Sequence, residues 1–276
     1  MSTTLRDSRS RHAAFHPVPP MRPGRPLHAL ALKAALVAWA GLAGVSAQAH
    51  GDAHTGGIAS RATPAVKAPF DIVHTRIRTE GNTAIFHMAV SGRAGAQRPG
   101  RHGQLAGSSV FSYVWPTTLD PAVVGFEPGA GTLAFAVTSH PDFDDTPLFD
   151  EDGDGDTGND GKRWHSHWVV LQPDAQCGPG ALKVGDIPEG TRPRLPKTWP
   201  GLPLLIDSPG WSPVFKAGQV EVRVPFDDLG AVKGARFDGV TAALRVNASV
   251  HAPLLCVVDV FKVASGNLSL PGQVDR

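Results

Sequence analysis

Short runs in which apolar and polar residues alternate, separated by breaks rich in glycine and proline, are the feature that most constrains this chain. Its 276 residues include 31 glycines and 25 prolines, and both residue types favour turns and interrupt helices. Alternation with a period of two is typical of strands with one buried face, as in residues 220–224. No window offers a convincing long amphipathic helix. We therefore predict an all-β fold, a single antiparallel β-sandwich with Greek-key-like order.

Eight segments carry this strand pattern, and one connection between them is unusually rich in proline. The expected strands are Asp71–Arg78, Thr83–Ser91, Ser109–Trp115, Thr132–Ser139, His165–Leu171, Val220–Phe226, Val240–Val250 and Leu255–Val263. Residues 188–213 hold seven prolines together with Trp199 and Trp211, so we expect an extended, stiff segment there. Its tryptophans either cover a sheet edge or face a ligand. Asp227-Asp228-Leu229 is expected to start a short helical turn.

The first 49 residues are typical of a secretory signal. Basic residues precede an apolar run, Ala34 to Val45, which is too short to span a bilayer comfortably. The run ends in Ala47-Gln48-Ala49, the small-residue pattern that signal peptidase accepts. We predict an N-terminal extension and cleaved signal peptide (1–49), a flexible arm (50–68) and one β-sandwich domain (69–276). The expected location is periplasmic or secreted, with retention of the segment as an anchor as the alternative.

Charge and cysteine content narrow the classes of function. Residues 1–49 carry six Lys/Arg and one Asp, which leaves 20 basic and 24 acidic residues, a formal net charge of −4. A mildly acidic protein without a basic stripe is not expected to bind nucleic acid, and no further segment resembles a membrane span. The two cysteines, Cys177 and Cys256, are expected to form a disulfide in an oxidising compartment. Two free buried thiols are the alternative.

The segment before the fifth expected strand is crowded with carboxylates. Residues 142–160 contain nine acids and no Lys or Arg. Calcium takes six to eight hard oxygen ligands, and alternating carboxylates can direct several side chains at one ion. The sequence therefore predicts a calcium site, and the candidate ligands are Asp150, Asp152, Asp154, Asp156 and Asp160.

The calcium loop resembles only the opening half of an EF-hand loop. Asp150, Asp152 and Asp154 occupy its first, third and fifth positions, with Gly155 at the sixth. The twelfth position is Gly161 where an EF-hand needs a bidentate Glu, and no helix is readable on either side. We expect an Asp-rich loop of the kind found in extracellular β proteins. The alternative is a solvated acidic turn, since Gly and Asp favour turns on their own.

A His-x-His pair follows the acidic loop. Residues two apart on a strand face the same way, so His165 and His167 should share one face, with Trp164, Ser166 and Trp168 on the other. Imidazole nitrogens suit zinc and copper, which predicts a possible transition-metal site. A third ligand must come from elsewhere, and the candidates are His140, His251, His87 and His74. The alternative is that both histidines are partly buried and bonded to neighbouring acids.

These patterns favour an exported metal-binding protein without assumed catalysis. It would hold calcium at the acidic loop and zinc or copper at the histidine pair, with a small molecule, a glycan or a protein as further ligand. One alternative is a periplasmic metalloenzyme in which His165 and His167 hold a water-activating metal. Another is a calcium-braced carbohydrate or adhesion module, with Trp199 and Trp211 as stacking platforms.

Overall fold

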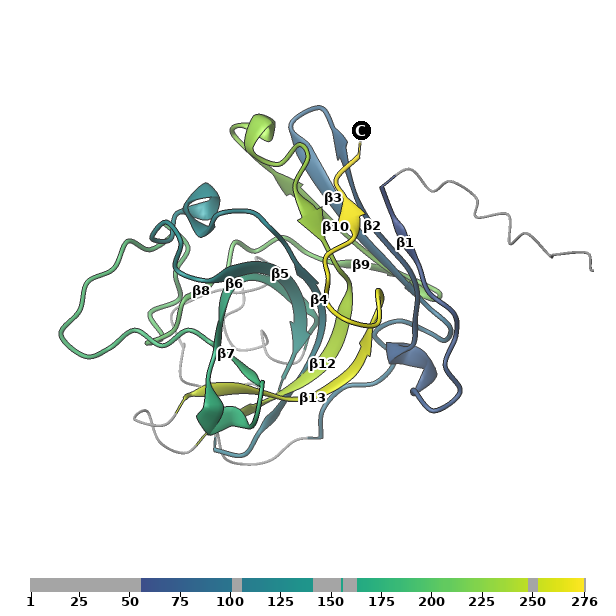
Figure 1. Ribbon diagram of the computed structural model, residues 1–276, viewed down its shortest axis with the longest axis horizontal. Coiled ribbons are helices and arrows are strands. Elements are labelled where there is room, and N and C mark those ends of the chain that lie inside the picture. The colour runs from purple at the N-terminus through teal and green to yellow at the C-terminus, as the bar shows by residue number, and fades with distance from the viewer. Residues whose placement is uncertain (1–55, 101–105, 141–154, 156–162, 248–252, 276) are drawn as a thin grey trace, which may run out of the picture. The chain divides into compact units, whose positions relative to one another are not determined.

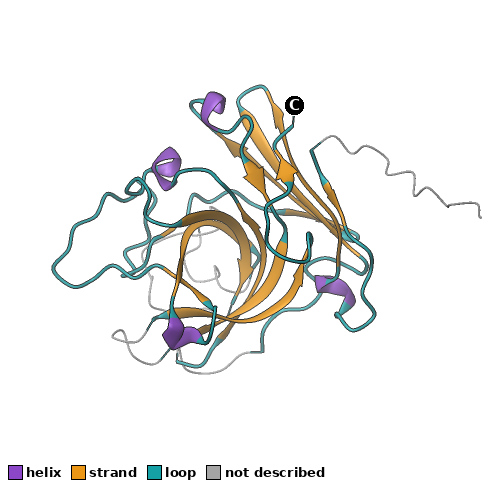
Figure 2. Cartoon of the chain, in the orientation of Figure 1, coloured by secondary structure: helices purple, strands orange, loops and turns teal. Residues whose placement is uncertain are grey.

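The computed structural model describes residues 56–100, 106–140, 155, 163–247 and 253–275, all within the compact unit His50–Arg276. Strands and short 3-10 helices are the regular elements of this part of the chain (Figure 2). None of the helices described is long and apolar enough to cross a membrane. The predicted all-β class is therefore confirmed.

The strands run through the described ranges from β1 to β14, with four 3-10 helices between them. The strands are β1 (Ile58–Ala59), β2 (Ile72–Glu80), β3 (Thr83–Val90), β4 (Ser109–Pro116), β5 (Thr132–Ser139), β6 (His165–Pro173), β7 (Leu182–Val184), β8 (Ile206–Asp207), β9 (Val214–Lys216), β10 (Gln219–Pro225), β11 (Arg236–Phe237), β12 (Val240–Val246), β13 (Leu255–Val263) and β14 (Gly272–Gln273). The 3-10 helices are η1 (Ala68–Phe70), η2 (Pro121–Val124), η4 (Ala175–Cys177) and η5 (Leu229–Ala231).

All eight expected strands are present, as β2–β6, β10, β12 and β13. The short helical turn is also present as η5, and the Asp228 side chain accepts a hydrogen bond from Gly230 N at its start. The strands that the sequence pattern missed are two or three residues long. Runs of that length are too short to show a periodicity.

One antiparallel sheet has five strands in the order β1-β2-β3-β10-β9. The consecutive strands β2 and β3 form a hairpin with Glu80 opposite Thr83. The far side of β3 pairs with β10, which lies more than 100 residues later in the sequence. Distant parts of the chain therefore meet within this sheet.

The second sheet closes on itself. Its order is β5-β4-β12-β13-β7-β6-β8, and β5 also pairs with β6, which completes a closed ring of six strands. Figure 1 views this ring nearly end-on, with the five-stranded sheet beside it. The predicted β-sandwich therefore needs correction, because the pairing of β5 with β6 closes this sheet into a barrel. A closed ring removes the free edges that a sheet of this size would otherwise have to protect.

The junction of β7 and β13 has the least strand pairing in the ring. A single residue pair, Cys256 with Lys183, joins these strands. The predicted disulfide between Cys177 and Cys256 is present and ties η4 to β13 at the same place. Lys183 adds ion pairs to Asp174 at 3.0 Å and to Asp186 at 2.7 Å. Covalent and ionic contacts thus support a junction with little strand pairing.

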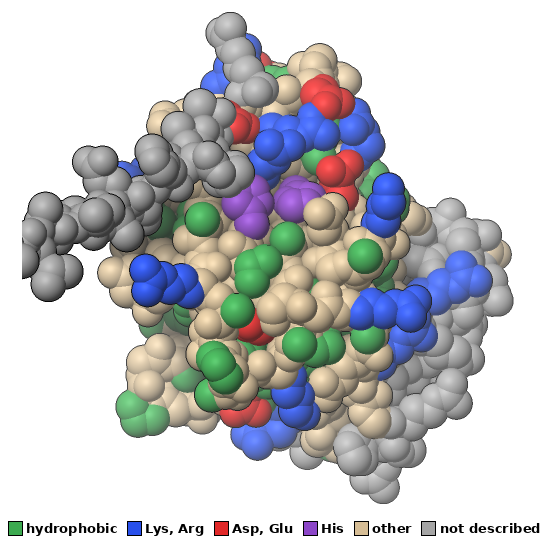
Figure 3. Space-filling model, turned by 90° about the vertical axis from the view of Figure 1, so that its right-hand side faces the viewer, with side chains coloured by type: hydrophobic (Ala, Val, Ile, Leu, Met, Phe, Trp, Pro, Cys, Tyr) green, Lys and Arg blue, Asp and Glu red, His purple; other side chains and the backbone are tan. Residues whose placement is uncertain are grey.

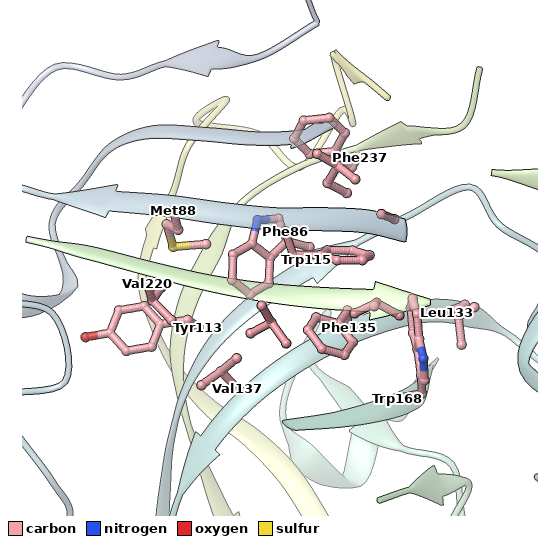
Figure 4. Close-up of a cluster of buried hydrophobic side chains, with 14 of the residues drawn as sticks. Phe86, Met88, Tyr113, Trp115, Leu133, Phe135, Val137, Trp168, Val220 and Phe237 are labelled. Atoms are coloured by element: carbon pink, nitrogen blue, oxygen red, sulfur yellow. The ribbon is translucent and has the colours of Figure 1, made fainter. Parts of the chain in front are cut away.

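An aromatic core lies between the outside of the barrel and the five-stranded sheet. We call it the outer core, and Figure 4 shows its side chains extending from both sheets toward one another. Phe86 from β3 contacts Phe135 and Trp168 of the barrel, with ring centroids 4.5 and 5.7 Å apart. Its largest fully buried members include Phe86, Trp115, Phe135, Trp168 and Phe237.

A second apolar cluster lies on the opposite face of the same barrel strands. Residues in β4, β5 and β6 alternate between the two clusters, and this second set contains none from the five-stranded sheet. Because the outer core occupies the outside of the barrel, the second cluster faces inward. Its members are mostly Ala, Val and Leu, including Val114, Ala134, Ala136, Val169 and Ala242. Small side chains suit the narrow interior of a ring of six strands.

Candidate metal centre

The pairing of β5 with β6 places two histidines on the inward face of the barrel. Thr138 lies opposite His165, and Ala136 lies opposite His167. Directly opposite residues of an antiparallel pair share a face, and Ala136 belongs to the inward-facing cluster. His165 and His167 therefore both point inward, with their ring centroids 4.6 Å apart.

The other face of β6 carries the residues that the alternation predicts. Trp164 and Trp168 are members of the outer core. The hydroxyl of Ser166 donates a hydrogen bond to the carbonyl oxygen of Trp211 at 2.7 Å. The predicted division of faces between the histidines and their neighbours is thus confirmed.

His140 is the third histidine of the group. It follows β5 and lies two residues beyond Thr138, so it continues the row of side chains on the inward face. Its Nε2 lies 3.1 Å from Nε2 of His165, and the two rings are nearly perpendicular with centroids 4.9 Å apart. One ring nitrogen from each of His140, His165 and His167 lies within 4.8 Å of the others, so the group can hold a metal ion. We call this group the three-histidine site.

A hydrogen bond fixes which nitrogen the His165 ring presents. Nδ1 of His165 lies 3.2 Å from the carbonyl oxygen of Arg163. A carbonyl only accepts, so Nδ1 carries the proton and Nε2 keeps its lone pair. Nδ1 of His167 lies 3.0 Å from Oγ of Ser208, a hydroxyl that both donates and accepts, so this contact does not fix the tautomer of His167. Metal-binding histidines commonly use the second nitrogen in this manner.

Burial keeps His167 neutral. The side chain is 2% exposed, and His165 is fully buried. Burial lowers the pKa of His167 to about 3, the charge of His140 lowers it further, and a hydrogen bond to the backbone of Asp207 acts in the opposite direction. A metal competes with protons for the imidazole lone pair. Near neutral pH, His167 therefore needs no deprotonation before it can bind.

The spacing of the nitrogens fits tetrahedral coordination. Two nitrogens bound at about 2.0–2.1 Å to a tetrahedral zinc lie about 3.3 Å apart. The 3.1 Å between the Nε2 atoms of His140 and His165 is close to that edge. A direct hydrogen bond between two neutral rings explains the same distance without a metal. The nitrogen that His167 offers lies within 4.8 Å of the other two.

Two of the other candidates for the third ligand lie on the five-stranded sheet. His74 of β2 and His87 of β3 have ring centroids 5.8 Å apart. Figure 3 shows histidine side chains on this side of the molecule, among basic and acidic side chains. Burial lowers the pKa of His87 despite a hydrogen bond with Gln219, and the charge of Arg76 lowers it further. Arg76 would repel a cation as well, and this pair joins no group of three metal-binding side chains in the described ranges.

The predicted calcium ligands lie outside the described residues. Asp150, Asp152, Asp154, Asp156 and Asp160 all fall within residues 141–162, of which only Gly155 is described. The candidate third ligand His251 lies outside them as well. The calcium site therefore stays a prediction.

The two loop tryptophans contribute to packing. Trp211 is half-buried against the outer core, with its ring centroid 6.2 Å from that of Phe135. Trp199 is also half-buried, and its Nε1 donates to the carbonyl oxygen of Leu204 at 3.2 Å. These contacts favour the interpretation that the proline-rich segment covers the sheet.

Sequence reasoning missed two hydroxyls beside the three-histidine site. Oγ1 of Thr138 lies 3.4 Å from Nε2 of His165, and Ser208 contacts His167 from a position 41 residues away. Thr138 lies two positions before the candidate ligand His140. This spacing in an extended chain could have indicated that the two side chains share a face. Nothing in the local sequence of Ser208 indicates its contact.

Comparison of the chain with protein-family models, with curated proteins and with solved structures finds no match. Function must therefore be argued from the site itself.

Proposed function

We propose that this chain is an exported metal-binding protein that holds one zinc or copper ion at the three-histidine site. The observation that carries the proposal is the convergence of three imidazole nitrogens within 4.8 Å of one another. The Nδ1 bond of His165 supports it, because it leaves the Nε2 lone pair of that ring for a metal.

The kind of donor favours a transition metal at this site. Imidazole suits zinc and copper, whereas calcium and magnesium prefer carboxylate, carbonyl and water oxygens. The described part of the site contains imidazoles and no carboxylate ligand. Calcium, if bound, belongs to the acidic segment around Asp150–Asp160, and export depends on the signal-like residues 1–49. Both parts of the proposal are supported by sequence pattern alone.

A metalloenzyme is the second candidate function, and the position of His140 favours it. Catalytic zinc commonly has three protein ligands and one open position, whereas structural zinc has four protein ligands. The described residues supply three ligands. The carbohydrate module gains no comparable support, because Trp199 and Trp211 are half-buried and hydrogen-bonded or packed.

Metal titration of the chelator-treated, full-length chain tests the proposal. We expect one Zn²⁺ or Cu²⁺ per chain to be bound at the site. At a free metal concentration of 100 times Kd, binding stabilises the folded state by about 2.7 kcal/mol. For a domain of this size, that corresponds to an increase in Tm of roughly 5–10 °C.

Two variants make the test specific. His167→Asn keeps a donor that can reach Ser208 but removes the metal-binding nitrogen, and should weaken the site by at least about tenfold. His87→Asn removes a histidine from the pair on the five-stranded sheet and serves as the matched control, with unchanged affinity. Equal metal affinity in His167→Asn and the wild type would show that the three-histidine site is not the metal centre.

The calcium expectation is tested separately. Added Ca²⁺ should raise the Tm of the wild type, and replacing Asp150, Asp152 and Asp154 together by Asn should abolish that increase. A calcium-independent Tm would remove the calcium site from the proposal and leave the three-histidine site unaffected.

A further inference from the structure

We infer that Ser208 is a positioning residue of the three-histidine site, and that its hydroxyl oxygen accepts the Nδ1 proton of His167 when this ring binds the metal through Nε2. The inference deepens the proposed function and rests on it. It also gives the proline-rich segment 188–213 a role beyond covering the sheet, because Ser208 belongs to that segment.

The contact between Ser208 and His167 carries the inference. Oγ of Ser208 lies 3.0 Å from Nδ1 of His167. Either tautomer of the neutral ring satisfies this contact without metal, because the hydroxyl both donates and accepts. A metal bound at Nε2 removes this freedom, since the neutral ring then carries its only proton on Nδ1. The hydroxyl oxygen of Ser208 is in place to accept that proton.

Burial makes an acceptor at this position necessary. Ser208 is 1% exposed and His167 is 2% exposed. A buried N–H without an acceptor is costly, so metal binding through Nε2 depends on an oxygen atom beside Nδ1. The backbone of Asp207 also makes a hydrogen bond with His167. Two consecutive residues of the proline-rich segment therefore contact this ring.

The backbone around Ser208 is held from two sides. Ser208 N donates to the carbonyl oxygen of Thr198 at 3.0 Å, and Oγ1 of Thr198 donates to Oδ1 of Asp207 at 2.6 Å. On the other side, β8 pairs with β6, and Asp207 lies opposite Trp168. These contacts fix the position of the Ser208 hydroxyl relative to β6. A fixed partner at the second nitrogen orients a metal-binding imidazole.

Ser166 provides a matched comparison on the same strand. It lies between His165 and His167 and is fully buried. Its hydroxyl also bonds to the proline-rich segment, at the carbonyl oxygen of Trp211, but from the opposite face of β6. Removing either hydroxyl takes away one buried contact between β6 and this segment. Of the two hydroxyls, the one on Ser208 contacts a candidate metal ligand.

Cobalt titration measures the effect of each hydroxyl on metal affinity. Chelator-treated, full-length variants are titrated with Co²⁺ against a competing chelator, and the visible absorption of the bound ion is the readout. Ser208→Ala should weaken Co²⁺ binding about tenfold or more, whereas Ser166→Ala should leave it unchanged. The Tm of each metal-free variant is measured alongside, and both should decrease. Metal affinity thus separates positioning of His167 from a general loss of contact with the segment.

The protonation of the His167 ring provides a second readout, which packing alone does not change. In Zn²⁺-loaded chain with ¹⁵N-labelled histidine, correlating the ring nitrogens with the carbon-bound ring protons shows which nitrogen carries a proton. The His167 signals are identified by their absence in His167→Asn. They should show a protonated Nδ1 and a metal-bound Nε2. This measurement uses the wild type, so it tests the inference even if Ser208→Ala does not fold.

The outcomes distinguish this inference from the proposed function. Failure of Co²⁺ to bind, or equal affinity in His167→Asn and the wild type, overturns both. Equal affinity in Ser208→Ala and the wild type overturns the inference alone, and would assign the Nδ1 proton to the backbone of Asp207. Equal weakening in Ser208→Ala and Ser166→Ala would mean that the segment acts through packing. A metal-bound Nδ1 in His167 would also contradict the inference.

Discussion

The two faces of one barrel wall differ sharply in composition. On the outward face, β4, β5 and β6 carry large aromatic side chains that pack against the five-stranded sheet. On the inward face, the same strands carry small aliphatic side chains, Thr138 and two histidines. The outward set includes Tyr113, Trp115, Phe135 and Trp168, and the inward set includes Val114, Ala134, Ala136 and Val169.

This difference shows how a strand period of two can separate stability from chemistry. Burial of aromatic side chains contributes most of the apolar area, so the outward face should dominate the free energy of unfolding. The inward face has less apolar area and carries polar side chains, Thr138 and the two histidines, at one end. Substitutions on neighbouring positions should therefore have very different consequences, depending only on which face they occupy.

The largest expected effect comes from truncating an outward aromatic. Phe135 is fully buried between Phe86 and Trp168, so Phe135→Ala should lower the free energy of unfolding by about 3–5 kcal/mol. Val169 on the inward face of the paired strand is the comparison, and Val169→Ala should cost about 1–3 kcal/mol. Urea denaturation of both variants measures the difference. Equal losses would mean that the two faces contribute alike.

Opening the disulfide tests the barrel itself. Cys177 and Cys256 are separated by 79 residues, and removing a crosslink over a loop of that length should cost about 2–4 kcal/mol. The double variant Cys177→Ser/Cys256→Ser should show this loss in a denaturation curve. Because β7 and β13 share a single residue pair, hydrogen exchange should increase first in these strands. Exchange that increases first in β2 and β3 would contradict this assignment.

The smallest net effect is expected for acidification, because two groups on opposite faces act in opposite directions. His167 has a folded-state pKa of about 3, below its ordinary value of about 6.5. The unfolded chain therefore takes up the proton first, and stability is lost as the pH falls below 6.5. Burial raises the pKa of Asp207 to about 6, although hydrogen bonds from Thr198 and Ser208 oppose the increase. Its stabilising contribution is present below pH 4 and is lost as the pH rises through 6.

Single variants should reveal each contribution in metal-free protein. Between pH 6.5 and 4, Asp207→Asn should lose about 3 kcal/mol of stability on acidification, and His167→Asn should gain about 2–3 kcal/mol. The wild type should change less than either variant. Denaturation curves at several pH values in the presence of chelator provide the measurement. Parallel profiles for all three proteins would show that neither group has a shifted pKa.

Much of the secondary structure could be predicted from the sequence, because the residues of each main strand are enough to indicate that strand. The alternation in residues 220–224 is local, and the strand expected there is present as β10. Closure of the barrel could not be predicted in this way. Closure depends on the pairing of β5 with both β4 and β6 and on a single residue pair at Cys256. The periodicity of a strand does not indicate which other strand it pairs with.

The candidate site was predictable to the same extent. His165 and His167 follow from the spacing of one strand, whereas the choice of His140 over His74 and His87 needed the register that places Thr138 opposite His165. Ser208 reaches His167 through β8, a strand of two residues that carries no sequence signal. Long-range register is therefore the information that the sequence pattern lacked.

The position of β12 in the sheet has a consequence for the timing of folding. This strand lies between β4 and β13, and its partner Phe111 precedes Ala243 by more than 130 residues. A ribosome releases the N-terminal partner long before the C-terminal one emerges. The barrel can therefore be completed only after almost the whole polypeptide has left, whereas His140, His165 and His167 emerge within 28 consecutive residues. The three histidines of the candidate site are thus all available before the strands that complete the ring around them.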